Sequence, residues 1–458
     1  MLTFQDFEQY GENGKAAFIV KAIDEFKTTP FYKNAIDAQA YYRGDNTTIL
    51  KRKNFIFDER GAMVEDITKA NNLVPTNFLE FIVTQEASTL LSNGVKTSEE
   101  IRKGLGGNKF DILLMKAGIY ALVDGVAWAY NYINEKGIFA TDLWRGTELV
   151  PLFDESNGVL RAGIRFYQID KDKPIYIELF EEDGVTKYSI SKDKDGNRKV
   201  NVREKKRAYN IKIASDIISE RVIDEFNWTT LPITPLYANE IKRSVFTRAF
   251  KAKNDLYDII LSDFGNNLED SKDVYWVIKN YNGQDLGEFL EMYKKYKAIT
   301  VDENGSAENK TIEVPYEARK TALEMIERLI YKEAMALDTS ALTGASLTTT
   351  AIKAATAALN NKVDKFEWQV SDFMEGVISL YLEWANKPNE EYTITFVRSG
   401  ITNDKETIEN LMLIRDEISD ATFYKNLPYV ENPEEEMMQA KVDGISKFKT
   451  EDVEENEV

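Results

Sequence analysis

The spacing of hydrophobic residues in the last third of the chain predicts two helices joined by a polar loop. Residues 317–335 carry apolar side chains three and four positions apart, which places them on one face of a helix. Residues 338–350 read DTSALTGASLTTT, and such small and hydroxylated residues favour a loop over a helix. The apolar positions of the first helix are Ala322, Ile326, Leu329 and Ile330.

A much longer helix is predicted over residues 351–386. Thr350 is its expected N-cap, and Pro388 lies where the helix must end. At about 1.5 Å per residue the helix would be roughly 50 Å long, more than a compact domain needs to cover its core. Its apolar stripe is formed by Ile352, Ala355, Leu359, Val363, Phe366, Val370, Phe373, Val377, Leu380 and Trp384.

Helical spacing also dominates the first part of the chain. The strings YYRGD and LSNGV close two of the predicted helices, because Gly44 and Gly94 are typical of helix C-termini. The N-terminal part is therefore expected to be mostly helical. The predicted helices cover residues 16–26, 31–42, 77–91 and 110–123.

The hydrophobic period then changes from that of a helix to that of a strand. The tetrapeptides EEDG (residues 181–184) and DKDG (residues 193–196) are typical of tight turns, so an antiparallel sheet is expected. The two prolines within residues 231–239 indicate a connection that follows this sheet. The predicted strands are residues 126–133, 149–153, 163–169, 176–180 and 187–190.

The sequence between residues 246 and 335 predicts two helices with a small α/β unit between them. Residues 246–268 form a strongly amphipathic helix, and the helix over 317–335 is expected to return beside it. The apolar stripe of the first helix is Phe246, Ala249, Phe250, Leu256, Ile260, Phe264 and Leu268. The unit between the two helices is expected to contain strands at 274–278, 298–301 and 311–314 and a helix at 285–296.

The predicted elements after Pro388 are shorter than those before it, and their sequence is more polar. It predicts a strand at 392–397, a helix at 405–417 and a turn-bounded segment at 423–429. Residues 431–458 contain ten Asp and Glu against three Lys, a charge run that is typical of a solvated tail.

Length and composition indicate a globular protein of about three structural units, since 458 residues include 43% hydrophobic and 12% aromatic residues. Residues 1–20 mix acidic and aromatic residues, so no secretory leader is expected. No uncharged apolar run is long enough for a membrane span, so no membrane contact is expected.

The absence of cysteine and histidine narrows the chemistry further. Without cysteine the chain has no disulfides, thiolate zinc sites or cysteine nucleophiles, and without histidine it has no histidine bases or ligands. Lys and Arg number 58 against 77 Asp and Glu, a net charge of -19. This charge opposes tight wrapping of DNA around the surface, but it does not oppose DNA that passes by without sticking.

Carboxylates offer the best case for an enzyme, because they alone can bind Mg²⁺ in a nuclease. Their spacing opposes this reading, since Asp263 lies off the helix face that Asp255 and Asp258 can share. Solvated or helix-terminal charges are the simpler interpretation. The candidates are Asp255, Asp258, Asp263, Glu269, Asp270 and Asp273.

Two short motifs are also interpreted without special chemistry. GLGG at residues 104–107, followed by Lys109, lacks the spacing and the preceding strand of a phosphate-binding loop and is expected to be a turn. Asn46, Thr47 and Thr48 have the form of a glycosylation acceptor, but this reading needs secretion, which nothing indicates.

Several strings, in a fixed order that covers nearly the whole chain, resemble phage portal proteins of the SPP1 type. The resemblance implies an α+β, mainly helical fold with wing, stem, clip and crown, long helices and a small antiparallel sheet. The strings are YYRGD (41–45), LLSNGV (90–95), DGVAWAYNYINEKG (124–137), KNDLYDIILSDFGNNLEDSKDVYWVIKNYNG (253–283), LTGASLTTTAIKA (342–354) and IRDEISDATFYKNLPYVENPEEEM (414–437).

By this resemblance each part of the chain has a place in a portal subunit. The expected parts are a wing (1–245), a first stem helix (246–272), a clip (273–315), a second stem helix (316–337), a tunnel loop (338–350), a long helix with its return to the wing (351–399), and a crown with an acidic tail (400–458).

The resemblance also implies a function. The protein is expected to form a ring, commonly of twelve subunits, at one vertex of a virion capsid after assembly in the host bacterial cytoplasm. Double-stranded DNA would pass through it during packaging and ejection, without sequence specificity. The implied partners are the terminase large subunit, a head–tail adaptor, and the major capsid and scaffolding proteins; no cofactor, metal or catalytic residue is implied.

The tunnel loop and the clip supply the candidate site residues. A loop of hydroxylated and small residues can touch a phosphate backbone without binding it tightly, and Lys353 is the expected phosphate contact unless it is only solvated. A carboxylate nuclease and a monomeric scaffold protein near 52 kDa are the alternative functions. The channel candidates are Thr343, Gly344, Ser346, Thr348, Thr349, Thr350 and Lys353. The partner-binding candidates in the clip are Tyr281, Asn282, Gln284, Asp285, Asp302, Glu303 and Asn304.

Overall fold

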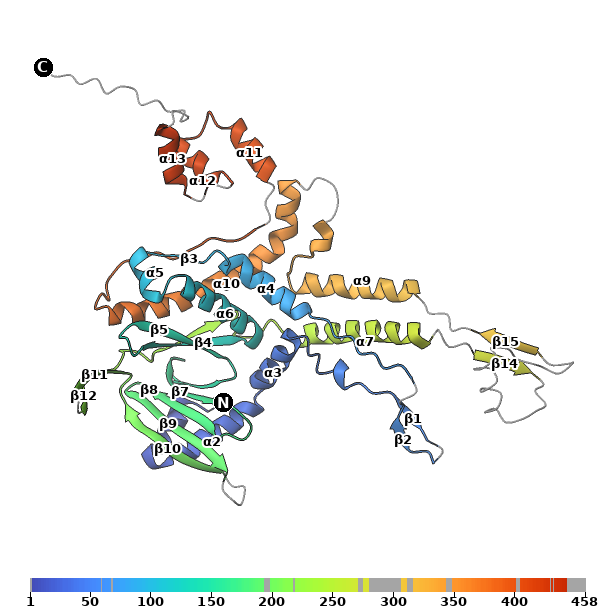
Figure 1. The fold of residues 1–458 in the computed structure, drawn as a ribbon, viewed down its shortest axis with the longest axis horizontal. Coiled ribbons are helices and arrows are strands. Elements are labelled where there is room, and N and C mark those ends of the chain that lie inside the picture. The colour runs from blue at the N-terminus through green and yellow to red at the C-terminus, as the bar shows by residue number, and fades with distance from the viewer. Residues whose placement is uncertain are drawn as a thin grey trace.

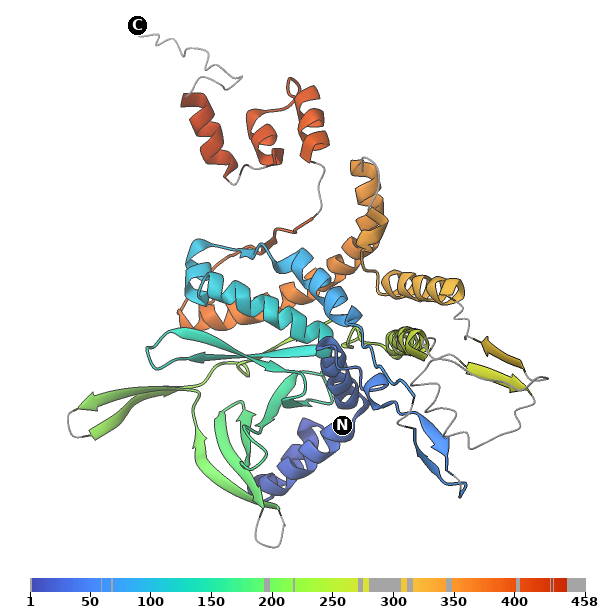
Figure 2. The same cartoon turned by 45° about the vertical axis from the view of Figure 1, so that its right-hand side comes forward.

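The computed structural model describes a body of helices and sheets from which several parts project (Figures 1 and 2). A pair of helices extends to one side, a small hairpin lies near it, and a unit of short helices stands apart at the C-terminal end. The mixed helix and strand content confirms an α+β fold. The described residues are 2–58, 60–66, 69–192, 198–216, 219–270, 275–279, 306–310, 316–342, 348–400, 404–428, 430 and 432–442.

The predicted N-terminal helices are confirmed, and two short ones are added. The C-cap of α3 is Arg43, where Gly44 follows at φ +78°, and the C-cap of α4 is Ser92, shortly before Gly94 at φ +71°. Gly106 and Gly107 form the expected turn, both with positive φ. The helices are α1 (Phe4–Gln9), α2 (Gly11–Thr28), α3 (Pro30–Tyr42), α4 (Phe78–Leu91), α5 (Glu99–Leu105) and α6 (Asn108–Asp124).

The antiparallel sheet is confirmed and is larger than predicted. A five-stranded sheet has the order β10-β9-β8-β7-β6, and a three-stranded sheet has the order β13-β4-β5. DKDG lies outside the described residues. The strands are β4 (Val126–Ile133), β5 (Phe139–Arg145), β6 (Leu149–Phe153), β7 (Leu160–Tyr167), β8 (Ile175–Glu181), β9 (Gly184–Lys192), β10 (Arg198–Arg207) and β13 (Ile233–Tyr237).

Two further details differ from the sequence prediction in this region. The segment with two prolines, expected to be a connection, contains β13. Pro235 is tolerated there because β13 is an edge strand, where one missing backbone donor does not break the ladder. A separate hairpin of β11 (Asn210–Asp216) and β12 (Ser219–Phe226) was not predicted.

The long helix α10 (Thr349–Trp384) passes through the largest hydrophobic core, between α4, α5, β4 and β13. Gly376 allows the close approach to β13, since a Cβ there would lie 2.6 Å from the Thr234 methyl group. In both ribbon views the first turns of α10 stand at an angle to the rest of the helix. The predicted stripe is buried at Ile352, Leu359, Val363, Phe366, Val370, Phe373, Val377 and Leu380.

Three predictions about α10 need correction. Thr348 is the N-cap in place of Thr350, because its hydroxyl accepts the Ala351 N–H. Ala355 is exposed, so the stripe is not buried along its whole length. The helix ends at Trp384, before the predicted end at residue 386, where Asn386 has already turned to φ +57°.

The helices α7 (Arg248–Asp270) and α9 (Tyr316–Glu333) lie side by side in opposite directions, and we call this pair the stalk. Lys253 pairs with Glu333 at 2.6 Å, and the rings of Phe264 and Tyr316 are 5.8 Å apart. Beyond the stalk, β14 (Tyr275–Lys279) pairs with β15 (Ser306–Lys310). The strand β14 was predicted, whereas β15 was not, because its sequence SAENK lacks the composition of a strand.

The remaining predictions for this unit lie outside the described residues. They are the helix at 285–296 and the strands at 298–301 and 311–314.

The predicted apolar faces of both stalk helices are wrong in part. On α7, Leu256 and Leu268 are each 48% exposed, whereas Asn254, Asp258 and Ser262 are fully buried. The reason is that the connection between α3 and α4 covers the polar side of α7. On α9, Ile326 and Ile330 are buried as predicted, but Leu329 is 40% exposed.

The C-terminal part forms a small helical unit. The expected strand at 392–397 is reduced to β16 (Thr395–Phe396), which pairs with β3 (Val95–Lys96). The helix α11 (Asp404–Leu413) is shorter than expected, and the expected turn-bounded segment forms α12 (Asp420–Asn426). With α13 (Pro433–Val442) these helices enclose a cluster of four buried residues: Leu411, Phe423, Tyr424 and Ala440.

None of the described helices is both long and apolar enough to cross a membrane.

Candidate functional site at the stalk and the start of the long helix

The first turn of α10 holds the channel candidates that the structure describes. The hydroxyl oxygen of Thr348 accepts the Ala351 N–H at 3.2 Å, and its carbonyl oxygen accepts the Ile352 N–H at 3.0 Å. Ile352 is buried, whereas Thr350 and Lys353 are exposed. Thr349 is the first residue of the helix.

The other candidates are not brought together by the described structure. Thr343, Gly344 and Ser346 lie outside the described residues, and so do all seven clip candidates: Tyr281, Asn282, Gln284, Asp285, Asp302, Glu303 and Asn304.

The segment that enters the loop is anchored to α4. The side-chain amide of Gln85 on α4 donates to the Leu337 carbonyl at 3.1 Å and accepts the Leu337 N–H at 2.8 Å. Leu337 is itself buried, and a short 3₁₀ helix, Thr339–Leu342, follows it. Asp338 accepts hydrogen bonds from the backbone and hydroxyl of Ser340. The root of the loop at Leu337 is therefore fixed to the body.

The exposed side of the first α10 turns is low in charge. Lys353 is the only charged residue between positions 349 and 361. Its neighbours on the exposed side are small and apolar or hydroxylated, as at Thr350, Ala354 and Ala358. This surface offers one ammonium group among hydroxyl and methyl groups, which suits brief contact with a polyanion better than tight binding.

The polar side of α7 is covered by residues 43–77, which connect α3 to α4 and which we call the strap. Asp258 lies at the centre of this contact and is fully buried. Its carboxylate accepts hydrogen bonds from the Asn46 amide at 2.6 Å, the Asn254 amide at 3.0 Å, and the Thr76 backbone and hydroxyl at 3.1 and 2.5 Å. Burial raises the pKa of Asp258, and the hydrogen bonds from Thr76 and Asn46 oppose this rise.

Asn46 organises the strap side of the same network. Its carbonyl oxygen accepts from the Tyr41 hydroxyl at 2.7 Å and from the backbone N–H groups of Thr48 and Ile49 at 2.9 and 3.0 Å. Tyr41 also donates to Asp255. Asn46 is 1% exposed, so the sequence that has the form of a glycosylation acceptor is a buried structural element.

The other candidate carboxylates of α7 are also engaged with the strap. The guanidinium of Arg52 pairs with Asp263 through two contacts of 2.7 and 3.3 Å. The Asn72 amide donates to Glu269 at 2.6 Å, and the hydroxyl of Ser262 accepts the Val74 N–H at 2.9 Å.

No metal site emerges from these carboxylates. Among the side chains that the structure describes, no three metal-ligating groups lie close enough to share an ion. Asp270 ends α7, and Asp273 lies outside the described residues. The geometry assigns Asp258, Asp263 and Glu269 to the contact between α7 and the strap.

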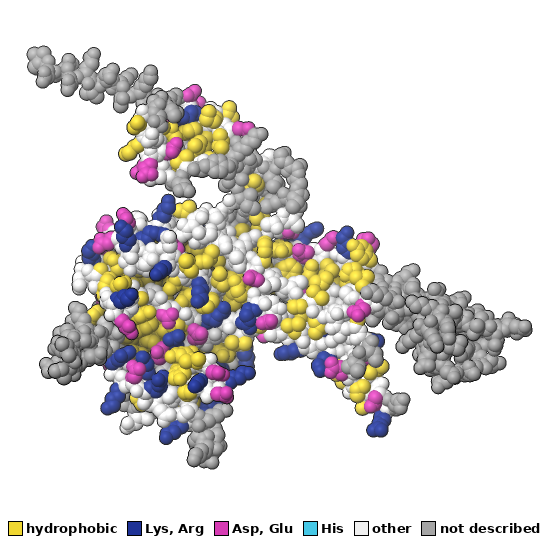
Figure 3. All heavy atoms as spheres, in the orientation of Figure 1, with side chains coloured by type: hydrophobic (Ala, Val, Ile, Leu, Met, Phe, Trp, Pro, Cys, Tyr) yellow, Lys and Arg dark blue, Asp and Glu magenta, His cyan; other side chains and the backbone are white. Residues whose placement is uncertain are grey.

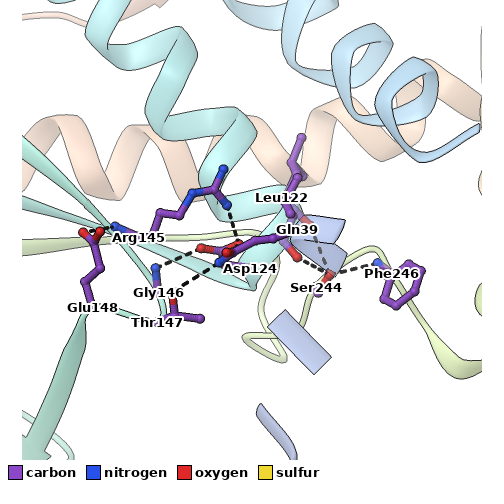
Figure 4. Close-up of polar contacts among 10 residues, drawn as sticks. Gln39, Leu122, Asp124, Arg145, Gly146, Thr147, Glu148, Ser244 and Phe246 are labelled. Carbon is purple, nitrogen blue, oxygen red and sulfur yellow. Dashed lines mark hydrogen bonds and ion pairs between the residues drawn. The ribbon is translucent and has the colours of Figure 1, made fainter. Parts of the chain in front are cut away.

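A second buried polar cluster joins the body to the start of α7 (Figure 4). Asp124, at the end of α6, accepts from the Arg145 guanidinium at 2.9 Å, the Gln39 amide at 3.1 Å and the Gly146 N–H at 3.1 Å. Burial raises the pKa of Asp124 to about 6, and Arg145 opposes this rise. The Arg145 guanidinium also lies 4.1 Å from the centre of the Tyr120 ring.

Ser244 completes this junction from the chain that enters α7. Its hydroxyl donates to the Val123 carbonyl at 2.6 Å and accepts the Phe246 N–H at 2.9 Å. The end of α6, the end of β5 and the start of the stalk are thus held at one place.

The sequence prediction missed these polar residues. Two signals were available: the polar residues 254, 258 and 262 recur every fourth position, and Asp124 opens one of the strings that carried the resemblance. Neither signal predicts the hydrogen-bond partners, because Asn46 and Thr76 are about two hundred positions away from Asp258 in the sequence.

Comparison with known proteins places this chain among the phage portal proteins. The family model described as "Phage portal protein, SPP1 Gp6-like" matches residues 27–446. The chain therefore belongs to this family of phage portal proteins.

Two relatives show how far the similarity extends. The portal protein of Bacillus phage SPP1 is 25% identical over 442 residues, which cover 92% of this chain and 84% of the relative. The portal protein of Clostridium phage phiCD119 is 23% identical over 433 residues, which cover 87% of this chain and 90% of the relative.

Proposed function

We propose that copies of this chain close into a ring at one vertex of a phage capsid, and that double-stranded DNA passes through the ring during packaging and ejection. The observation that carries this proposal is the family match across residues 27–446, which includes the body, the stalk and the long helix together. A ring of twelve copies is the expected form, since members of this family commonly assemble so.

The parts of the fold take portal roles in this proposal. The body would be the wing (1–245), the stalk helices the two stem helices (246–272 and 316–337), and the strands beyond the stalk part of the clip (273–315). Residues 338–350 would be the tunnel loop. Residues 351–399 would be the long helix with its return to the wing, and residues 400–458 the crown with its acidic tail.

The start of α10 supports contact with passing DNA on chemical grounds. Each basic side chain that neutralises a phosphate strengthens binding and its dependence on salt, so a channel for moving DNA needs few of them. Lys353 would provide one such contact per subunit, and Thr348 and Thr350 would provide hydroxyl groups. The root of the tunnel loop at Leu337 is held by the body through Gln85, so movement of the loop would leave this root in place.

The partners follow from the same assignment. The clip would face the terminase large subunit during packaging and a head–tail adaptor afterwards. The wing would face the major capsid protein and, during assembly, the scaffolding protein. Assembly would take place in the bacterial cytoplasm, and the finished ring would remain in the virion.

Electron microscopy of the purified chain in negative stain tests this proposal. The expected result is a ring with a central hole and a mass of several hundred kilodaltons, whereas a monomeric scaffold would give particles near 52 kDa. Since each subunit carries a net charge of -19, rings should be more abundant at moderate salt than at low salt. Absence of rings at every salt concentration would contradict the proposal.

A nuclease assay tests the alternative enzyme function. Incubation of the chain with DNA and Mg²⁺ is expected to give no cleavage, because Asp258 and Asp263 are engaged with the strap. Cleavage that is lost in Asp263→Ala would favour the nuclease.

A further inference from the structure

The hairpin of β1 (Phe55–Phe57) and β2 (Met63–Glu65), at the far end of the strap, exposes an unusual amount of apolar surface. Its large apolar side chains are 40–72% exposed, and none of them belongs to a hydrophobic cluster of the described residues. A two-stranded hairpin without a covered face is marginally stable in water, and the described residues supply no surface that covers this one. The side chains are Phe55, Ile56, Phe57, Met63 and Val64.

The strap nevertheless holds this hairpin in a defined place near α7 (Figures 1 and 2). At its base, Lys53 pairs with Glu65 at 2.6 Å and the Asn54 carbonyl accepts the Asp66 N–H at 2.8 Å. The next residue towards α3, Arg52, pairs with Asp263 of α7. These contacts fix the base of the hairpin to α7, so its apolar side chains are held in a defined position.

The stalk carries a second apolar surface that remains exposed among the described residues. The Lys253–Glu333 ion pair joins α7 and α9 on one flank. Leu256 follows Lys253 by three positions and Leu329 precedes Glu333 by four, so both side chains lie on this flank, and Met325 continues the row on α9. These three side chains are 40–58% exposed. Figure 3 shows apolar side chains gathered over the stalk.

We propose that the hairpin of each copy docks on this stalk flank of the next copy in the ring. Two different surfaces on one chain give a head-to-tail contact, and such a contact closes into a ring when the rotation between copies permits. This inference rests on the proposed ring, and it names the segments that hold neighbouring subunits together.

The amount of surface supports a second copy as the occupant. Half-exposed side chains of this size offer about 100 Å² each, so the hairpin offers on the order of 500 Å². A stable interface buries about 800 Å² on each partner, so the hairpin would supply a large share of one contact. The stalk flank is a second exposed apolar surface on the same chain. A capsid protein bound to the hairpin would leave this flank exposed, whereas a second copy of the chain covers both surfaces.

Loss of the hairpin surface provides the first test. In the full chain, Phe55→Ser combined with Phe57→Ser should raise the subunit concentration for half-assembly of rings at least about tenfold. The reciprocal pair, Met325→Ser with Leu329→Ser, should have a similar effect. Ile112→Ser with Ile169→Ser is the matched control, since both residues are more than 70% exposed and lie on other surfaces.

Thermal unfolding of the separated monomers distinguishes lost contact from lost folding, because the exposed residues should leave the melting temperature unchanged. Normal rings from the hairpin variant would overturn the proposal and would favour a capsid protein as the occupant. Absence of rings from the wild-type chain would instead overturn the proposed function itself.

Disulfide cross-linking provides the second test, since the natural chain contains no cysteine. Cysteine would replace one hairpin residue (Ile56, Phe57 or Met63) and one flank residue (Leu256, Met325 or Leu329) in each combination. Oxidised rings should give a ladder of covalent multimers, whereas two single-cysteine variants mixed together should give dimers only. Rings in which no combination gives a ladder, or in which the disulfide forms only within one chain, would overturn the proposal.

Discussion

The helices α7 and α10 show two different ways in which this protein holds a long helix. On α10 the buried stripe is apolar from Ile352 to Leu380, and the helix passes through the largest core. On α7 the buried side in the middle of the helix is polar, with Asn254, Asp258 and Ser262 against the strap, while Leu256 is half exposed. Both helices have a clear apolar stripe in the sequence. The helix α10 buries most of its stripe within one chain, whereas α7 buries Phe250 and leaves Leu256 half exposed.

This difference shows that an apolar stripe in the sequence predicts a helix but does not predict which segment of the protein will cover that stripe. Burial of Asp258 is tolerated because four donors from Asn46, Asn254 and Thr76 satisfy its carboxylate. Leu256 of the α7 stripe remains half exposed, and this side chain is part of the contact proposed between subunits.

The largest expected effect is the loss of a core side chain from α10. Phe373→Ala should lower the free energy of unfolding by about 3–5 kcal/mol, because Phe373 is fully buried and the change leaves a cavity. Denaturant unfolding of the monomer measures this change. Trp368→Ala on the same helix is the control, since its side chain is mostly exposed and should cost less than about 1 kcal/mol. Equal costs would mean that the apolar side of α10 is not the buried one.

The next effect concerns the polar side of α7. Asp258→Ala should cost about 3–4 kcal/mol, because the buried donors of Asn46, Asn254 and Thr76 lose their acceptor. Leu256→Ala, two positions away, should cost less than about 1 kcal/mol in the monomer. Chemical denaturation of both variants compares the two faces directly. A larger cost at Leu256 would reverse the comparison and restore the prediction made from the sequence.

A pH titration sharpens the contrast, since apolar contacts such as those of Phe373 carry no titratable group. The pKa of Asp124 is about 6, above its ordinary value of 3.8, so between these values the native state binds more protons than the unfolded state. Stability should therefore increase as the pH falls from 7 to 4, by up to about 3 kcal/mol. The measurement is the unfolding free energy of the wild type minus that of Asp124→Asn. An opposite slope would mean that Arg145 and the other donors outweigh burial.

The smallest effect tests how α10 begins. Thr348→Ala should cost about 1 kcal/mol, because the Ala351 N–H loses its acceptor. Thr350→Ala should change stability by less than about 0.5 kcal/mol, since Thr350 lies within the first turn and alanine favours a helix. Thermal unfolding of the two variants compares them. A larger cost at Thr350 would indicate that the helix begins two residues later, as its sequence first suggested.

Local sequence signals predicted the positions of most secondary structure. The helices α3 and α4 end beside Gly44 and Gly94, and β4 and β6 have the predicted bounds, because spacing and turn chemistry act over a few residues. The strand β15 was missed because its polar residues form a strand only through pairing with β14. The short helix α12 was missed for a similar reason, since it packs on α13.

The sequence by itself determined most of the segments that are helices and strands, where several of them stop, and, through the order of its strings, the portal family. Only the tertiary structure decided which side of α7 is buried, that Asn46 belongs to a buried network, and that Asp124 meets Arg145. It also decided that Thr348 caps α10. The physical reason is range: helix and turn preferences act between neighbours, whereas burial depends on which distant segment arrives to cover a surface, as the strap does for α7.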